Sequence, residues 1–153
     1  MPCEFNTRLV TFDEVFLDLS WIWLNDPEIK QMTGTPDFTR ESQQIWFKSL
    51  TLKTDYKIWG VHVNEVPAGA CGIKNITNSD CEYWGYIGEK NLWGHGIGFK
   101  LLTLMEMNAR EIGKSTIWLR VTKQNVKAIQ LYLRNDYNTE SETDNELIMR
   151  KIL

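Results

Sequence analysis

The sequence predicts a single α/β (α+β) domain spanning residues 1–153. Two observations carry this prediction. Apolar residues recur at helical spacing in some segments and alternate with the strand period of two in others. A strand-like stretch beginning at Glu82, a loop of glycines and an apolar helix then follow one another directly, as far as Met107. A chain of this length can bury a core without the help of metals or disulfides.

Capping and turn residues bound the elements of the first half. Asp26 before Pro27 is a typical helix start, and Thr39 can cap another helix. Asn64–Pro67 predicts a hairpin turn. The expected elements, in order, are a strand at Thr7–Val10, a helix at Asp13–Leu24, a helical turn at Glu28–Met32, a loop at Thr33–Phe38, a helix from Thr39 to about Leu52 that buries Ile45 and Trp46, and strands at Ile58–Val63, Ala68–Ile76 and Cys81–Gly88.

The second half begins with the helix that follows the glycines, at Phe99–Met107, whose apolar side carries Leu101, Leu102 and Met105. The remaining expected elements are an interior strand at Thr116–Thr122 whose Trp118 is expected in the core, a helix at about Val126–Asn135, and two closing strands at Tyr137–Thr143 and Glu146–Ile152.

The glycines at positions 94, 96 and 98 predict a phosphate-bearing ligand. The first turn of a helix has N–H groups without partners and carries partial positive charge, and glycines let a diphosphate approach the backbone closely. A Walker loop would need a hydroxyl residue after Lys100, where Leu101 stands. A dinucleotide fold would end its next strand in an acid, whereas Lys123 follows here.

Composition excludes several other classes. A net charge of -3 argues against nucleic-acid binding, which depends on clustered Lys and Arg. His62 and His95 have no Cys, His or acidic neighbour at ligand spacing, so no metal site is expected. The N-terminus is polar and no apolar run approaches about twenty residues, so we expect no membrane contact and a cytoplasmic location.

Cysteine usage also favours a reducing compartment. Cys3, Cys71 and Cys81 are odd in number and form no Cys-x-x-Cys pair. Cys71 lies in an apolar strand and is expected to be a small buried side chain.

Two patterns in this order resemble the GNAT superfamily of acyl-CoA N-acyltransferases. Trp93-Gly94-His95-Gly96-Ile97-Gly98 is similar to that family's Arg or Gln, two residues, Gly, one residue, Gly or Ala. Asn125, Ala128 and Tyr132 are similar to its Asn, two residues, Ala, three residues, Tyr. The segment Trp23–Ile29 looks like the subgroup that acetylates ribosomal-protein N-termini or nucleotide-linked amino sugars.

The resemblance covers nearly the whole chain and implies a mostly antiparallel central sheet with helices on both faces. Two departures stand out. Trp93 replaces the usual Arg or Gln, so the phosphates would be held by backbone amides of about Gly94–Phe99 and not by that side chain. Asn135-Asp136 replaces the usual Gly before the last aromatic residue, so that turn should differ locally.

The resemblance implies acetyl-CoA as co-substrate, with no metal. Pantetheine would lie where the strand Tyr83–Gly88 separates from the strand Thr116–Thr122. The diphosphate would be held by backbone amides, and the amide of Ile87 or Gly88 would face the thioester carbonyl. The residues expected at the cofactor are Ile87, Gly88, Gly94, His95, Gly96, Ile97, Gly98, Phe99, Asn125 and Tyr132, with the side chain of His95 exposed.

Tyr132 corresponds to the family's general acid, because a phenol can donate a proton to the departing thiolate. At helical spacing from Ala128 it is otherwise a packing residue. Asn125 either bonds the cofactor or caps the following helix, or does both. For the base we favour Glu82, with Asp80 and Glu89 as rivals; the alternatives are a water chain and a surface role for Glu82.

Four aromatic residues and one methionine lie in the segments that frame the acceptor cleft of the family and are expected to bind the acceptor, namely Trp23, Trp46, Tyr83, Trp84 and Met32; each aromatic ring could instead be core. Aromatic faces suit a sugar ring or a nucleobase. The sequence therefore predicts an acetyl-CoA-dependent N-acetyltransferase whose acceptor is the amine of a nucleotide-linked amino-deoxysugar. A protein N-terminus or another small-molecule amine is the alternative acceptor, and a non-catalytic acyl-CoA-binding domain is the alternative class. A homodimer is common among relatives and is kept as an expected state.

Overall fold

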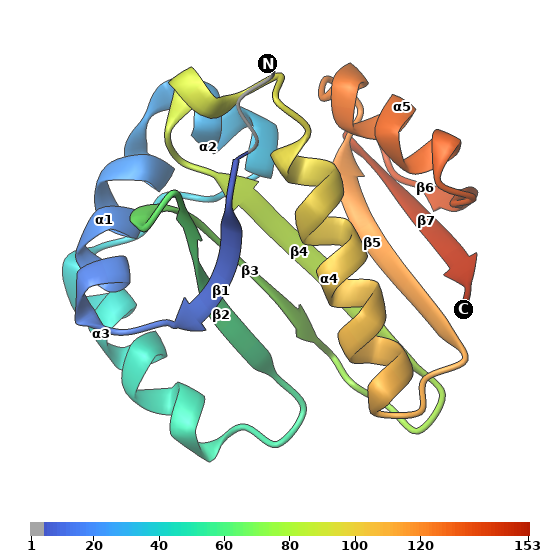
Figure 1. The fold of residues 1–153 in the computed structure, drawn as a ribbon, viewed down its shortest axis with the longest axis horizontal. Helices are drawn as coiled ribbons and strands as arrows, with labels where there is room; N and C mark the ends of the chain where they lie inside the picture. The colour runs from blue at the N-terminus through green and yellow to red at the C-terminus, as the bar shows by residue number, and fades with distance from the viewer. Residues whose placement is uncertain (1–4) are drawn as a thin grey trace.

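Seven strands form one sheet in the part of the chain that the computed structural model describes, residues 5–153 (Figure 1). Their order across the sheet is β1-β2-β3-β4-β5-β7-β6. The pairing of β4 with β5 is parallel and every other pairing is antiparallel, which confirms the predicted fold class. The strands are β1 (Thr7–Thr11), β2 (Lys57–Val63), β3 (Val66–Lys74), β4 (Asp80–Ile87), β5 (Thr116–Thr122), β6 (Asn138–Glu142) and β7 (Glu146–Ile152).

Helices cover both faces of this sheet (Figure 1). They are α1 (Glu14–Asn25), α2 (Pro27–Thr33), α3 (Arg40–Ser49), α4 (Ile97–Glu111) and α5 (Val126–Arg134), with short 3-10 turns at Leu50–Leu52 and Lys90–Leu92. Successive residues of a strand point to opposite faces. Tyr83 of β4 accordingly packs in the core under α4, and Trp84 packs against the core under α1. None of these helices is long and apolar enough to cross a membrane within residues 5–153.

Side-chain caps define the helix starts of the first half. The Asp26 carboxylate accepts hydrogen bonds from the amides of Glu28 and Ile29, and Thr39 forms a reciprocal capping box with Ser42, as the sequence predicts. The predicted buried side of α3 is wrong at Ile45, which is 71% exposed. Gln43 is the buried residue of α3, because its amide donates to the Leu17 carbonyl (3.0 Å) and the Ser20 hydroxyl (2.9 Å) of α1.

Two further sequence expectations change, one about a turn and one about a tryptophan. The β2–β3 hairpin has a two-residue turn at Asn64 and Glu65, both with positive φ, so Pro67 lies in β3. Trp118 is only half-buried on β5, and its ring lies 5.4 Å from the Arg120 guanidinium carbon. The core position predicted for it is wrong, since its buried neighbours Ile117 and Leu119 point to the other face.

Asp136 takes the positive-φ position that the absent glycine would occupy, and Asp tolerates this conformation better than most residues. Cys71 and Cys81 are buried, while Cys3 lies outside the described residues.

Candidate active site

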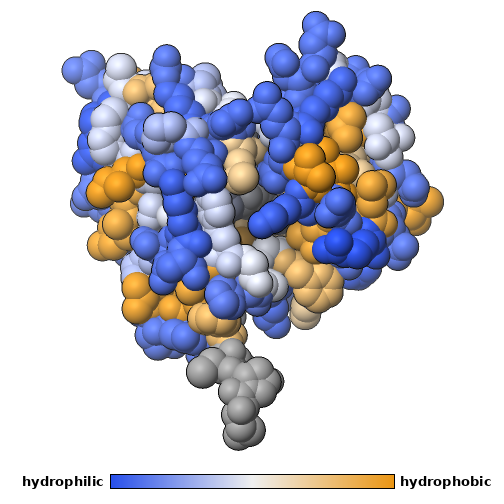
Figure 2. Space-filling view, turned by 90° about the horizontal axis from the view of Figure 1, so that it is seen from above, coloured by the Kyte–Doolittle hydropathy of each residue, from blue (hydrophilic) through white to orange (hydrophobic). Residues whose placement is uncertain are grey.

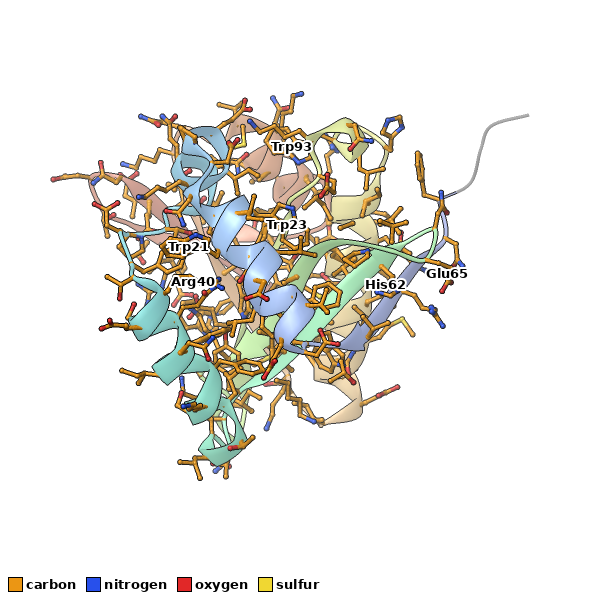
Figure 3. The ribbon with its side chains drawn as sticks, turned by 90° about the vertical axis from the view of Figure 1, so that its left-hand side faces the viewer. Trp21, Trp23, Arg40, His62, Glu65 and Trp93 are labelled. Atoms are coloured by element: carbon orange, nitrogen blue, oxygen red, sulfur yellow. The ribbon has the colours of Figure 1, made fainter. Side chains whose placement is uncertain are left out.

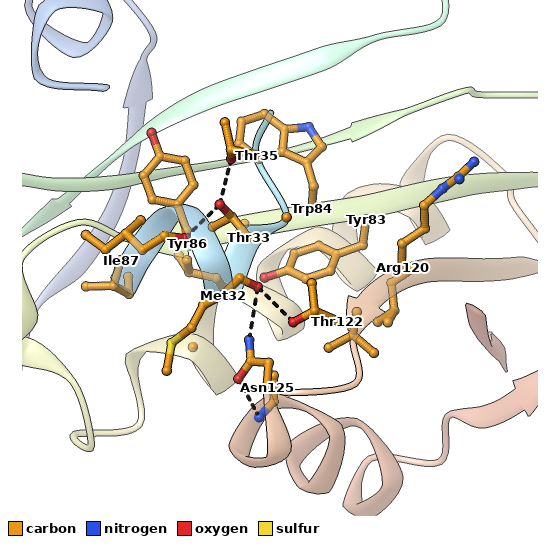
Figure 4. A pocket seen from close by; sticks show the side chains of 18 of the residues that line it. Met32, Thr33, Thr35, Tyr83, Trp84, Tyr86, Ile87, Arg120, Thr122 and Asn125 are labelled. Carbon is orange, nitrogen blue, oxygen red and sulfur yellow. Dashed lines mark hydrogen bonds between the residues drawn. The ribbon is translucent and has the colours of Figure 1, made fainter. Parts of the chain in front are cut away.

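A cavity opens where β4 and β5 separate. Their parallel pairing runs from Asp80 opposite Thr116 to Tyr83 opposite Leu119 and stops there, although both strands continue. The gap belongs to a cavity of about 1510 Å³ lined by residues from both sides of the sheet. Figure 2 shows the surface hollowed between the two sides of the molecule, and Figure 4 shows the side chains inside.

The Ile87 amide faces this gap. Along β4, alternate residues pair with β3, and the Gly88 N–H continues that series by donating to the Ala68 carbonyl at 2.7 Å. Because successive peptide groups of a strand point to opposite edges, the Ile87 N–H points away from β3, toward the space that β5 has left. Of the two predicted amides, we therefore favour Ile87 as the one that faces the thioester. The Gly88 amide is already bonded, and only Ile87 offers a donor to the cavity.

Gly88 has a packing role. A Cβ atom at this position would lie 2.2 Å from the ring of Trp23, so only glycine fits there. Gly88 is buried and does not line the cavity.

The glycine loop and the start of α4 offer an anion site. Gly94 and Gly96 both have positive φ, and neither would place a Cβ within 4 Å of another atom. No side chain caps α4, so the amides of its first turn keep their donors for a ligand. Gly94, Gly96, Ile97, Gly98 and Phe99 all line the cavity. His95 is exposed, contacts Phe5 with a ring separation of 4.8 Å and does not line it.

Tyr132 of α5 lines the cavity on the same side as the glycine loop. Its hydroxyl donates to no other group in residues 5–153, which leaves its proton available to a ligand. Burial raises the pKa of the Tyr132 phenol to about 12. The phenol therefore stays protonated at neutral pH, as a proton donor requires.

Asn125 joins two elements at the bottom of the gap. Its carboxamide oxygen accepts from the Ala128 amide at 3.3 Å, capping α5, and its nitrogen lies 3.5 Å from the Met32 carbonyl. The Thr122 hydroxyl donates to the same carbonyl at 3.4 Å (Figure 4). The C-terminal end of α2 is thus tied to β5 and α5, and Met32 is brought against the cavity.

Glu82 is a buried carboxylate that lines the cavity. Its Oε1 accepts from the Asn75 amide at 2.8 Å, while its Oε2 lies 3.6 Å from Arg120 Nε and 4.0 Å from Lys74 Nζ. The rival carboxylates are engaged elsewhere. Asp80 accepts from Thr77 and Arg150, which lowers its pKa, and Glu89 accepts from the Trp23 indole at 3.1 Å. Neither rival lines the cavity.

Aromatic side chains form the wall on the α1–α3 side. Trp84 and Tyr86 of β4 stack at 6.4 Å with an interplanar angle of 25°, and Trp46 of α3 and Tyr56 also line the cavity. Four of the five residues expected at the acceptor line the cavity, namely Met32, Trp46, Tyr83 and Trp84. Tyr83, however, is buried on the α4 face of the sheet and does not belong to this wall. Trp23 is 4% exposed beneath Gly88 and lies outside the lining.

Lys74 and Arg120 are cavity residues that the sequence patterns did not single out. Lys74 ends β3 directly opposite Glu82, and Arg120 follows Leu119, the last residue of β5 that pairs with β4. The alternation of residues along the strands could have placed both on the Glu82 face, but only the pairing register brings them to the same carboxylate.

Comparison with known proteins identifies the architecture. The acetyltransferase (GNAT) family matches residues 18–137 of the chain. Acetyltransferase PseH of Campylobacter jejuni is 29% identical over 127 residues, covering 82% of this chain and 79% of PseH.

Two solved structures have the same fold. The crystal structure of C. jejuni N-acetyltransferase PseH in complex with acetyl coenzyme A has a TM-score of 0.74 and 21% identity, over 96% of this chain and 99% of that one. Spermidine N-acetyltransferase from Vibrio cholerae, in complex with CoA and spermine, has a TM-score of 0.82 and 15% identity, over 97% and 95% of the chains. The chain therefore belongs to the acetyltransferase (GNAT) family and is an acetyl-CoA-dependent N-acetyltransferase.

Proposed function

We propose that the acceptor is the primary amine of a nucleotide-linked amino-deoxysugar. The observation that carries the proposal is the pair of cations, Lys74 and Arg120, which share the single carboxylate of Glu82 beside an aromatic wall. This group of three has a net positive charge. It suits the diphosphate of a sugar nucleotide, and the stacked rings of Trp84 and Tyr86 suit a sugar or base.

The same charges oppose the competing acceptors. A polyamine carries several positive charges and would be repelled by Lys74 and Arg120. A peptide acceptor would bring an N-terminal amine without the phosphates that these cations can pair with. Another small-molecule amine, without phosphate, remains the second candidate because it would still meet the aromatic wall.

In the proposed reaction, acetyl-CoA supplies the acetyl group when bound, and the chain's own groups act around it. The amides at Gly94–Phe99 hold the diphosphate. The Ile87 N–H donates to the thioester carbonyl oxygen as negative charge develops there. Tyr132 donates its proton to the sulfur that leaves.

Glu82 is proposed to accept the amine proton through water. Its Oε2 pairs with Arg120 Nε at 3.6 Å and Lys74 Nζ at 4.0 Å but accepts no hydrogen bond from residues 5–153, so it can still accept one from a water. Five residues of extended strand separate it from Ile87, or about 16 Å between the Cα atoms. Direct contact with an amine at the Ile87 amide is therefore not expected, and a water relay connects the two.

Thiol release from acetyl-CoA tests the acceptor class. We would compare a nucleotide-linked amino-deoxysugar, the same amino sugar without its nucleotide, spermidine and a short peptide with a free N-terminus. The nucleotide-linked sugar is expected to give the highest kcat/KM, and the free nucleoside diphosphate should compete with it. A higher kcat/KM for spermidine or the peptide would reject the proposal.

Two variants test the cations. Arg120→Gln and Lys74→Gln should each raise the acceptor KM about tenfold, equivalent to about 1.4 kcal/mol, with the KM for acetyl-CoA unchanged. Lys57→Gln, which removes an exposed lysine of β2 outside the cavity, is the matched control. Equal acceptor KM values in all three variants and the wild type would show that the cations do not bind the acceptor.

The pH dependence tests the base. In Glu82→Gln, the acidic limb of the kcat/KM profile should disappear or shift, because the proton acceptor is lost. A profile that keeps the wild-type acidic limb would exclude Glu82 as the base.

A further inference from the structure

We propose that Trp93 is a positioning residue that orients the Ile87 amide, rather than a ligand of the diphosphate. This inference rests on the role proposed above for that amide. Trp93 lines the cavity, and its indole N–H donates to the Ile87 carbonyl at 2.9 Å. Its only strong donor is therefore directed at the protein backbone and is not free for a phosphate.

The hydrogen bond from Trp93 to the Ile87 carbonyl replaces one that β4 loses where it separates from β5. The Ile87 carbonyl and the Ile87 N–H both point toward the gap, since both belong to the edge of β4 that faces β5. Had β5 continued alongside, its backbone would have bonded both groups. The Trp93 indole satisfies the carbonyl and leaves the N–H as the one donor of Ile87 open to the cavity.

The peptide group between Ile87 and Gly88 is consequently held by a hydrogen bond at each end. Its carbonyl, from Ile87, accepts from Trp93, and its N–H, from Gly88, donates to the Ala68 carbonyl at 2.7 Å. Rotation of this peptide would break both hydrogen bonds. The end of β4 thus stays extended beyond the point where it loses β5 as a neighbour.

A second indole supports the same segment from the other side. Trp23 packs against Gly88 and donates to the Glu89 carboxylate at 3.1 Å. Figure 3 shows Trp23 on α1 and Trp93 in the loop after β4, toward the same end of the molecule. The two indoles hold Ile87, Gly88 and Glu89 in a defined conformation, so the Ile87 N–H is oriented before a ligand arrives.

The test is Trp93→Phe, which keeps an aromatic ring and removes the donor. We expect kcat to fall about tenfold or more, because a misplaced transition-state donor costs rate, while the dissociation constant of CoA stays within about twofold of wild type. Replacement of the Trp93 indole by benzothiophene, which keeps the ring shape and lacks the N–H, should give the same result and serves if Trp93→Phe fails to fold. Trp21→Phe, which alters an indole outside the cavity, is the control.

The NMR resonance of the Ile87 backbone amide distinguishes a failure of the role proposed for that amide from a failure of the positioning role of Trp93. In the wild type it should shift between the CoA and acetyl-CoA complexes, and in the Trp93 variants that shift should shrink. No wild-type difference would overturn the role of the Ile87 amide itself. A wild-type difference that persists in the variants, with kcat unchanged, would overturn the positioning role alone. A weaker CoA affinity with kcat unchanged would identify Trp93 as a cofactor ligand, and this result would also reject the positioning role.

Discussion

The two sides of the cavity are built from different parts of the chain. On the α4–α5 side the cavity is lined by the uncapped start of α4, by glycines without side chains and by one phenol, Tyr132. On the α1–α3 side they are large side chains, with Trp46, Trp84 and Tyr86 forming a wall and Lys74 and Arg120 sharing a carboxylate. A backbone site depends on the conformation of one loop, whereas a side-chain site depends on how several elements pack together.

This difference has a consequence for specificity. Backbone amides can hold the same diphosphate in any chain with this loop, so we propose that the α4–α5 side binds the co-substrate. Side chains can change one at a time without disturbing the fold, so the α1–α3 side can select the acceptor. Variants on the two sides should therefore separate kinetically.

The largest effect is expected from Tyr132→Phe. Removing the proposed proton donor should lower kcat about 100-fold, while the dissociation constant of acetyl-CoA stays near the wild-type value, since the ring remains. Steady-state kinetics and calorimetric titration measure the two quantities.

Tyr137→Phe is the matched control. Tyr137 lies 5.8 Å from Tyr132 between ring centroids, but its hydroxyl is buried and donates to Glu106 at 2.8 Å. Its loss should lower the free energy of unfolding by about 1 kcal/mol and leave kcat unchanged. Similar kcat values for Tyr132→Phe and the wild type would remove the catalytic role and leave Tyr132 as a packing residue.

The second effect concerns the backbone site. Gly96→Ala forces a side chain into a positive-φ conformation at the start of α4 and should weaken CoA binding about tenfold. Gly113→Ala imposes the same conformational cost after the other end of α4, where φ is +82° and no atom is within 4 Å. Both variants should lose about 1 kcal/mol of stability. Only the first should lose CoA affinity; equal affinities would show that the loop does not contact the cofactor.

A smaller effect is expected on the acceptor side. Trp46→Leu should raise the acceptor KM about fivefold through lost ring contact, with the KM for acetyl-CoA unchanged. Trp21→Leu is its control, because Trp21 does not line the cavity and packs beside Arg40, which also lies outside the lining (Figure 3). A larger change in the KM for acetyl-CoA than in the KM for the acceptor would show that Trp46 contacts the co-substrate and not the acceptor.

The same contrast explains what the sequence could predict. The glycine loop, the Asn125 cap and the order of elements follow from local patterns, and the structure has them. The direction of Trp23 and the exposure of Ile45 depend on how α1 and α3 pack, which no local pattern contains. The choice between the Ile87 and Gly88 amides required the pairing register of β3 with β4. The cation pair at Glu82 required the registers on both sides of β4.

The smallest effect is a displacement of the alkaline limb of activity. Burial raises the pKa of Tyr132 to about 12, so the phenol keeps its proton as the pH rises through 10, where an exposed tyrosine would ionise. With Tyr132 as the proton donor, kcat should stay level from pH 8 to about pH 11 and fall only above it. Stopped-flow measurement, corrected for the hydrolysis of acetyl-CoA at each pH and accompanied by circular dichroism to confirm folding, gives the profile. A decline with an apparent pKa near 10 in folded protein would mean either that the Tyr132 side chain is open to water or that a different group with an ordinary pKa controls the step. Either result would contradict the proposal that a buried, protonated Tyr132 phenol is the proton donor on the α4–α5 side of the cavity.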